Sequence, residues 1–282
     1  MKRSPVKVVA FFMSEGGQTP PHGYIIKHKK TMDKKTADYI RLLAEKYETA
    51  DFLKDDPSLF MHKVEGAADM EVMAFAASCL SYGSRKQFFP KIQYMLDRSG
   101  GRMDEWVRSG SFADDIPNED RCYYRLYTQH DMHLLLQTLR AMLTEHGSLG
   151  QFVRANATDG YGAVGALCAY FAERNASTVI PRDTKSACKR VCMFMRWMVR
   201  DGSPVDLGLW TRFIDKRTLI MPLDTHVVQQ SQRLGLLTSR TASMSAARRL
   251  SQAMLEVFPD DPLKGDFALF GYGVNNKGDQ PT

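Results

Sequence analysis

The sequence contains no Cys-x-x-Cys pair, and its five cysteines form an odd set: Cys79, Cys122, Cys168, Cys188 and Cys192. Each lies in an apolar helical context or beside charged residues, which argues for reduced thiols and against a disulfide framework. We therefore expect a cytoplasmic protein. The apolar run at residues 8–13 is too short for a signal-peptide core or a membrane span, so no membrane contact is expected.

A convincing set of metal ligands is also lacking. His130 and His133 lie three positions apart and could begin a metal site. No convincing third ligand accompanies them, although a zinc site needs at least three protein ligands. We interpret the two histidines as a surface pair and predict neither a metal nor another cofactor.

Clusters of β-branched residues are few, whereas residues that favour helices are plentiful, so the sequence predicts an all-α protein. Its 282 residues, 44% of them hydrophobic, suffice for one large domain or two small lobes. We predict a poorly ordered extension at residues 1–32, one helical domain at residues 33–275 and a flexible tail at residues 276–282.

Apolar residues recur with helical spacing along most of the chain. We expect Asp69 to cap a helix that runs to about Leu80, and Ser84 to begin another that runs to about Leu96. Further helices are expected at residues 36–47, 134–143, 161–171 and 225–234, from Ser243 or Ser245 to Phe258, and from Asp266 onwards.

Positive charge is concentrated in residues 182–217. This segment holds nine Lys or Arg and four Asp, a net charge of +5, whereas the whole chain carries +6. A cluster of this kind suits contact with a phosphate backbone better than a diffuse excess does. The alternative interpretation is a basic face that only water covers.

Residues 188–199 have the apolar spacing of a helix with one buried stripe. Thr184 or Ser186 is expected to cap this helix, which places Lys189 in its first turn. Arg196 and Arg200 lie seven and eleven positions after Lys189, on the other side of the helix. We therefore expect an exposed cationic ridge formed by these three residues.

A lysine in the first turn of a helix lies beside unpaired backbone amides, whose partial positive charge favours the free amine that a nucleophile needs. The effect is about 1 kcal/mol, which changes the acid dissociation constant of a lysine less than tenfold. Burial and the neighbouring Lys185 and Arg190 would have to supply the remaining stabilisation of the free amine. The alternative is that Lys189 is one more solvated residue of a basic face.

Asp224 begins a second helix of the same region. Pro222 forces Met221 to be extended, and the residues after Asp224 have helical spacing up to Gly235. The pattern predicts that Asp224 is the N-cap and that Gly235 ends the helix. By itself, this explains Asp224 as a cap and nothing more.

Two segments resemble one family. Leu-Asp-Thr-His-Val at residues 223–227, followed by Arg-Leu-Gly-Leu, resembles the segment after the hairpin in helix-hairpin-helix DNA glycosylases, and the run that begins at Lys189 resembles their lysine-led helix. Asp224 follows Lys189 by 35 positions, a spacing similar to that of the archaeal 8-oxoguanine DNA glycosylases. From about residue 36 to 274, the chain resembles an uncharacterised bacterial family placed near those enzymes.

The resemblance implies a two-lobed helical fold with a cleft between the lobes, DNA as the partner and an oxidised purine such as 8-oxoguanine as the substrate. It also implies that Lys189 attacks the sugar as an AP lyase and that Asp224 stabilises the developing positive charge. We expect a monomer. Our candidates for substrate binding are Tyr82, Arg85, Arg125, Lys185, Arg190, Arg196, Trp197, Arg200 and His226.

The chain departs from that family at two points. Residues 182–188 contain no glycine, so a phosphate-binding hairpin there must be remodelled, and no cysteine follows Cys192 to form an iron-sulfur cluster. These departures leave two alternatives open. One is a non-catalytic DNA- or RNA-binding helical module, and the other is a plain helical scaffold with a basic face.

Overall fold

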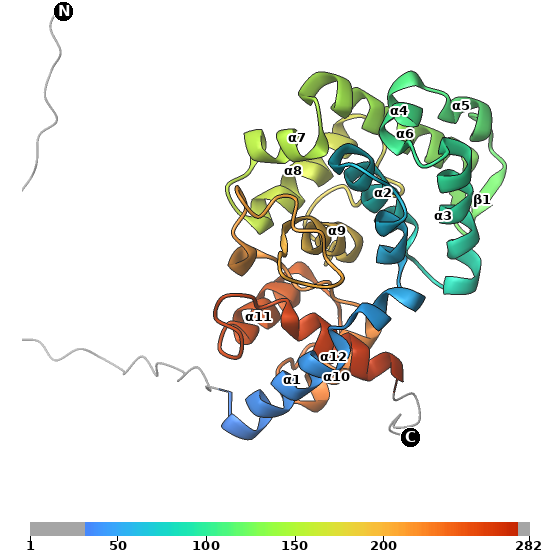
Figure 1. Cartoon of the computed structure of the whole chain (residues 1–282). Helices are drawn as coiled ribbons and strands as arrows, with labels where there is room; N and C mark the ends of the chain where they lie inside the picture. Colours follow the sequence, from blue (N-terminus) through green and yellow to red (C-terminus); the bar gives the residue numbers. More distant parts are fainter. Residues whose placement is uncertain (1–31, 276–282) are drawn as a thin grey trace, which may run out of the picture. The chain divides into compact units, whose positions relative to one another are not determined.

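The computed structural model describes residues 32–275 of the chain. The predictions for the extension at residues 1–32, apart from Met32, and for the tail at residues 276–282 lie outside the described residues. Figure 1 labels most of the elements, which are α1 (Lys34–Tyr47), η1 (Ala50–Asp55), η2 (Pro57–His62), α2 (Ala67–Leu80), α3 (Arg85–Ser99), α4 (Met103–Ser109), α5 (Phe112–Asp115), β1 (Cys122–Tyr124), β2 (Tyr127–Thr128), α6 (Gln129–His146), α7 (Leu149–Asn156), α8 (Gly160–Glu173), α9 (Lys189–Val199), η3 (Lys216–Thr218), α10 (Thr225–Arg233), α11 (Met244–Met254) and α12 (Lys264–Asn275).

The described residues are mostly helical, which confirms the predicted all-α class at this coarse level. A short antiparallel hairpin of β1 and β2 is the exception, and it pairs Cys122 with Thr128 and Tyr124 with Tyr127. Arg125 turns the chain with a φ of 52°, in the left-handed region that non-glycine residues rarely adopt. The sequence did not predict this hairpin because its strands are only three and two residues long.

Helices α2 and α9 form the centre of the core and pack against each other. Every residue from Glu71 to Leu80 of α2 is buried, and so is every residue from Val191 to Arg200. These residues of α2 are almost all apolar, so this part of the helix has no polar face to expose to water. The start of α9, by contrast, lies near the surface, because Lys189 and Arg190 are half-buried.

The last helix, α12, packs against both α1 and α10 (Figure 1). The approach of α12 to α10 is close, because a Cβ atom at Gly273 would lie 2.9 Å from the Cβ atom of His226. Real Cβ atoms do not approach so closely, so glycine is needed at this crossing. This packing places the first turn of α10 against the side of α12.

Several predicted helix ends differ from the structure. Helix α2 begins at Ala67 after Gly66, and Asp69 instead accepts a hydrogen bond from the backbone amide of Asp104 in α4. Helix α3 extends beyond Leu96 to Ser99, and α11 ends at Met254, before Phe258. The predicted cap Ser243 does accept a hydrogen bond from the amide of Ala246, so that start is confirmed.

Candidate functional site

A cavity of about 1300 Å³ opens where the start of α3, the start of α9, the start of α10 and the side of α12 come together. The loop between α10 and α11 contributes the last part of its wall. Apolar side chains, among them Phe52, Phe88, Met193 and Phe270, line part of the cavity. Both Lys189 and Asp224 line it as well, so the structure brings the two predicted catalytic residues into one cavity.

Lys189 is the first residue of α9, which confirms its predicted position in the first turn. The predicted cap is wrong, because Cys188 occupies the cap position with a φ of 46° and makes no side-chain capping bond. Ser186 instead forms a backbone bridge with Ser243. The Lys189 side chain is 34% exposed, and its Nζ atom lies 3.5 Å from Oδ2 of Asp224.

Asp224 is the N-cap of α10, as predicted: its Oδ1 atom accepts a hydrogen bond from the amide of Val227 at 2.9 Å. The other carboxylate oxygen, Oδ2, is the one that faces Lys189. The side chain is only 14% exposed. One carboxylate therefore caps a helix and pairs with the lysine at the same time, so its role as a cap does not exclude a chemical role.

A second carboxyl group in the cavity wall, near Asp224, was not predicted as a site residue. Asp266 lies in the first turn of α12, is buried, and accepts a hydrogen bond from Arg196. Burial raises the pKa of Asp266 to about 6, although the neighbouring charge of Arg196 opposes this change. The charge of Asp224 adds to the increase, and that of Lys189 acts against it. Asp266 therefore belongs to the same electrostatic group as the pair.

The predicted cationic ridge is wrong for two of its three members. Arg196 and Arg200 are buried, with exposed fractions of 3% and 0%. Arg196 donates to Asp206 at 3.1 Å and to Asp266, while Arg200 donates to Asp261 at 2.8 and 2.7 Å. With their charges neutralised inside the protein, neither side chain is available to bind a substrate phosphate.

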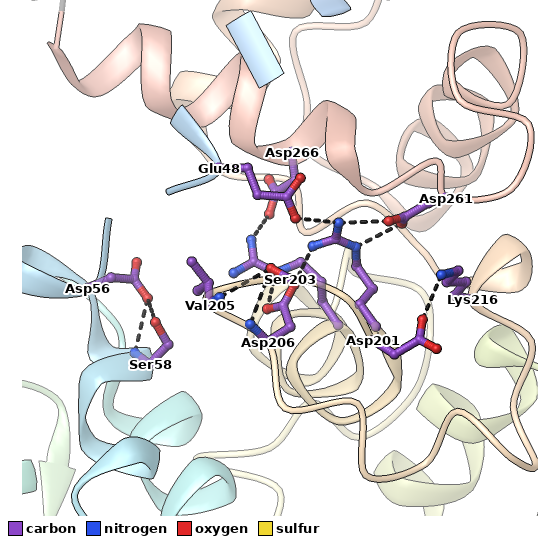
Figure 2. Close-up of polar contacts among 12 residues, drawn as sticks. Glu48, Asp56, Ser58, Asp201, Ser203, Val205, Asp206, Lys216, Asp261 and Asp266 are labelled. Atoms are coloured by element: carbon purple, nitrogen blue, oxygen red, sulfur yellow. Dashed lines mark hydrogen bonds and ion pairs between the residues drawn. The ribbon is translucent and has the colours of Figure 1, made fainter. Parts of the chain in front are cut away.

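Figure 2 shows how these acidic residues gather around the two guanidinium groups. Glu48, at the end of α1, accepts a hydrogen bond from Arg200 at 2.7 Å, and Asp206 accepts from both arginines. Burying a charge is tolerated only when a partner and hydrogen bonds compensate for the lost water. The network therefore explains why a helix face with arginines can lie in the core.

Three other predicted binding residues either do not line the cavity or already form hydrogen bonds within the protein. Lys185 is 93% exposed, pairs with Asp183 at 3.6 Å, and does not line the cavity. Trp197 is fully buried in the core, and its indole nitrogen has no hydrogen-bond partner among residues 32–275. Arg190 does line the cavity, but its guanidinium donates to the carbonyl of Cys79 at 2.8 Å and to the hydroxyl of Tyr127.

Four predicted binding residues remain. Tyr82, Arg85 and His226 line the cavity. Arg125 does not line it, but its guanidinium carbon lies 4.9 Å above the ring of the exposed Tyr82. The ring of His226 lies edge-on to that of Phe270, with 6.1 Å between the ring centroids. Three predicted binding residues therefore share the cavity with the Lys189–Asp224 pair, and Arg125 contacts one of the three.

All five cysteines are free, as predicted. Cys188 lines the cavity immediately before Lys189, and its sulfur lies 4.0 Å from that of Cys168. A hydrogen bond from Cys168 lowers the pKa of the Cys188 thiol. No group of three or more His, Cys, Asp or Glu that could hold a metal ion occurs within residues 32–275.

These features define a mostly helical protein with a lysine–carboxylate pair in a partly apolar cavity. Residues 56–275 match the family described as "Protein of unknown function (DUF2400)", and the chain therefore belongs to that family. No curated protein and no solved structure matches the chain. In the part of the chain that the structure describes, no helix is both long and apolar enough to cross a membrane.

Proposed function

We propose that this protein is a DNA base-excision glycosylase with AP-lyase activity and that Lys189 and Asp224 are its catalytic residues. One observation supports the proposal most strongly: a half-buried lysine amine lies 3.5 Å from a carboxylate inside a cavity of about 1300 Å³. A lysine nucleophile needs an ordered position and partial removal from water, and the reaction needs a negative group near the sugar, where positive charge develops. Lys189 is half-buried at the start of a packed helix, and the Asp224 carboxylate lies beside it.

In the proposed reaction, a nucleotide is flipped out of the DNA so that its base enters the cavity. The Nζ atom of Lys189, as the free amine, attacks C1′ of the sugar. The new N–C1′ bond forms as the glycosidic bond breaks, and the electron pair of that bond leaves with the base, which takes up a proton. Oδ2 of Asp224 stabilises the positive charge that develops on the sugar.

The remaining steps follow from the chemistry of the covalent intermediate. The attached nitrogen loses a proton, the sugar ring opens, and a Schiff base forms between Lys189 and C1′. Loss of a proton from C2′ then expels the 3′ phosphate and nicks the strand, and water releases the lysine. No cofactor is required at any step, because every electron pair comes from the amine or from a bond that breaks.

The finer features of this proposal come from the family resemblance. They are a two-lobed glycosylase-like arrangement, an oxidised purine such as 8-oxoguanine as the substrate, and action as a monomer. The apolar side chains of the cavity wall, such as Phe270 and Met193, suit a flat aromatic base. The cytoplasmic location expected from the reduced thiols is part of the same proposal.

The second candidate is a non-catalytic DNA- or RNA-binding helical module. The observation in its favour is the segment before α9, where residues 182–188 contain no glycine and where Ser186 instead bridges to Ser243. A backbone that binds phosphate through a tight glycine turn is therefore not formed at this position. The second candidate keeps the cavity as a binding site and assigns no chemistry to Lys189.

Base release by wild type separates the two candidates, and replacement of Asp224 by asparagine tests the role of Asp224 in it. Asn is as good an N-cap as Asp, so we expect an unchanged melting temperature. The carboxylate charge is lost, and we expect base release from an oligonucleotide that carries 8-oxoguanine to fall by roughly 100-fold or more. Base release is measured by separation of cleaved and intact strands after alkaline treatment.

The matched control is Asp159→Asn. Asp159 caps α8 through a 2.6 Å hydrogen bond from the amide of Gly162, and it does not line the cavity. It therefore loses the same charge in the same kind of helix cap, and base release should stay at the wild-type level. If Asp224→Asn were as active as wild type, Asp224 would be only a cap and the proposed catalytic pair would lose one member.

A further inference from the structure

The charged residues that line the cavity have unequal numbers of partners. Its three acidic residues all have partners: Asp56 accepts from Ser58, Asp224 pairs with Lys189, and Asp266 accepts from Arg196. Three of its cationic residues, in contrast, have no hydrogen-bonding or ion-pair partner within the described residues 32–275, and these are Arg85, Lys86 and Arg240. The charge that remains unpaired in the cavity wall is therefore wholly positive.

These three cations come from two segments far apart in the sequence. Arg85 and Lys86 are the first two residues of α3, and the buried side chain of Phe88 fixes this first turn to the core. Arg240 lies in the loop between α10 and α11. Two distant segments of the chain, the start of α3 and the loop, therefore supply cations to one cavity wall.

The loop that carries Arg240 is held in place by hydrogen bonds. The side-chain amide of Gln232 donates to the carbonyl of Ser239 at 2.9 Å, and the amide of Thr241 donates to the Ser239 hydroxyl at 3.2 Å. Three residues after Arg240, Ser243 forms the backbone bridge with Ser186, in the segment that leads into Lys189. The position of Arg240 is therefore tied to that of the proposed nucleophile.

We propose that Arg85, Lys86 and Arg240 form a clamp that binds the phosphates of one nucleic-acid strand on either side of the nucleotide in the cavity. This inference rests on the proposed function and deepens it, because it names the contacts that replace the buried Arg196 and Arg200. Unpaired cations around an apolar cavity match a nucleotide strand, whose phosphates are anionic and whose bases are apolar on their faces. Of the three, only Arg85 was among the residues that the sequence singled out.

Binding as a function of salt concentration tests the clamp directly. The probe is a fluorescent DNA duplex that contains one tetrahydrofuran residue, an abasic analogue that cannot form a Schiff base. For each phosphate contact that is lost, the slope of log K against log salt concentration should decrease in magnitude by about 0.9. We expect this decrease for Arg85→Gln, Lys86→Gln and Arg240→Gln, and a cumulative decrease for the triple variant.

The matched control is Arg212→Gln. Arg212 is exposed and unpaired within the described part of the chain, but it does not line the cavity. Its replacement removes the same charge from the protein, and the slope should stay at the wild-type value. An unchanged slope for Arg240→Gln, an equal decrease for Arg212→Gln, or no binding of the probe by wild type would each overturn the clamp.

The outcome is independent of catalysis because the probe cannot react. A decrease in slope confined to the three clamp variants would support the clamp even if no covalent intermediate were ever trapped, and the non-catalytic module would then be the better function. Conversely, trapping of an intermediate with unchanged slopes would support the proposed chemistry and reject the clamp.

Discussion

Arg196 and Arg200 illustrate how a helical pattern can misplace a charged residue. Their spacing from Lys189 put them on the side of the helix opposite the apolar stripe, yet both are buried. The carboxylates that make this burial tolerable include Glu48, at the end of α1, and Asp261, just before α12. Local spacing carries no information about such distant partners, so the sequence could not reveal that the whole of residues 191–200 is core.

Loss of one arginine of this network should destabilise the protein. Arg200→Gln leaves Asp206, Asp261 and Glu48 without one of their cationic partners in the interior. Removal of one member of a buried ion pair costs about 3–5 kcal/mol, so the free energy of unfolding should fall by about that amount. Denaturation by urea at neutral pH measures this change.

Arg212→Gln again serves as the control, because it removes an exposed and unpaired arginine of the described chain. Surface changes of that kind alter the free energy of unfolding by about 0.5 kcal/mol or less. Equal stabilities of the Arg200→Gln and Arg212→Gln proteins would contradict the buried network.

The positions of Lys189 and Asp224 at helix starts were predictable because each has a local signature, whereas their catalytic roles came from the family resemblance. Lys189 opens a helix with a regular apolar stripe, and Asp224 precedes a helix that Pro222 and Gly235 delimit. The structure adds that their side chains lie 3.5 Å apart, which neither signature shows. Asp266 was missed as a site residue, because an aspartate in the first turn of an apolar helix is ordinary, and only the fold places it in the cavity wall.

At the scale of the element, periodicity located most helices but not their ends. Residues 161–171 were predicted as helical, and α8 runs from Gly160 to Glu173. The ends depend on single contacts such as the cap at Asp159, which accepts from the amide of Gly162. Such contacts compete with other short-range arrangements, so periodicity alone leaves a helix boundary uncertain by several residues.

Two glycines of α8 give a prediction at this scale. A Cβ atom at Gly160 would lie 2.7 Å from the carbonyl oxygen of Thr218 and 3.0 Å from the Cα atom of Leu219. Both are backbone atoms that cannot rotate away, so Gly160→Ala should lower the free energy of unfolding by about 1–3 kcal/mol. Thermal or urea denaturation measures the loss.

The control lies in the same helix. A Cβ atom at Gly165 would meet only the methyl group of Thr184 at 3.9 Å, an ordinary contact. Alanine has the better helix propensity, so Gly165→Ala should raise the free energy of unfolding by about 0.5–1 kcal/mol. Opposite signs for the two variants are expected, and a stabilised Gly160→Ala protein would show that α8 does not pack closely on residues 218–219.

At the scale of the whole described unit, the cavity depends on segments from nearly the entire chain. Arg85 starts α3, Lys189 starts α9, Asp224 caps α10, and Asp266 lies in α12. The buried charge network joins the end of α1, α9 and the first turn of α12 (Figure 2). The sequence could indicate the fold class and the two central residues, but assembly of the cavity depends on long-range packing that no local pattern encodes.

The same packing gives Lys189 the ordered position that the proposed chemistry needs. Lys189 is held by a packed helix and faces Asp224, whereas Lys185, four positions earlier, is 93% exposed and does not line the cavity. A nucleophile must be held within roughly 3–3.5 Å of the atom that it attacks, which favours the ordered residue. Glutamine at either position keeps most of the side-chain length and removes the amine, so the two variants form a matched pair.

Trapping of the covalent intermediate with borohydride is the most direct measurement. Wild type, Lys189→Gln and Lys185→Gln are incubated with DNA that carries an 8-oxoguanine or an abasic site, and the reduced protein–DNA adduct is resolved on a denaturing gel. The proposed chemistry predicts an adduct for wild type and for Lys185→Gln, and none for Lys189→Gln. An adduct that persists in Lys189→Gln, or its absence from wild type on both substrates, would contradict the assignment of Lys189 as the nucleophile.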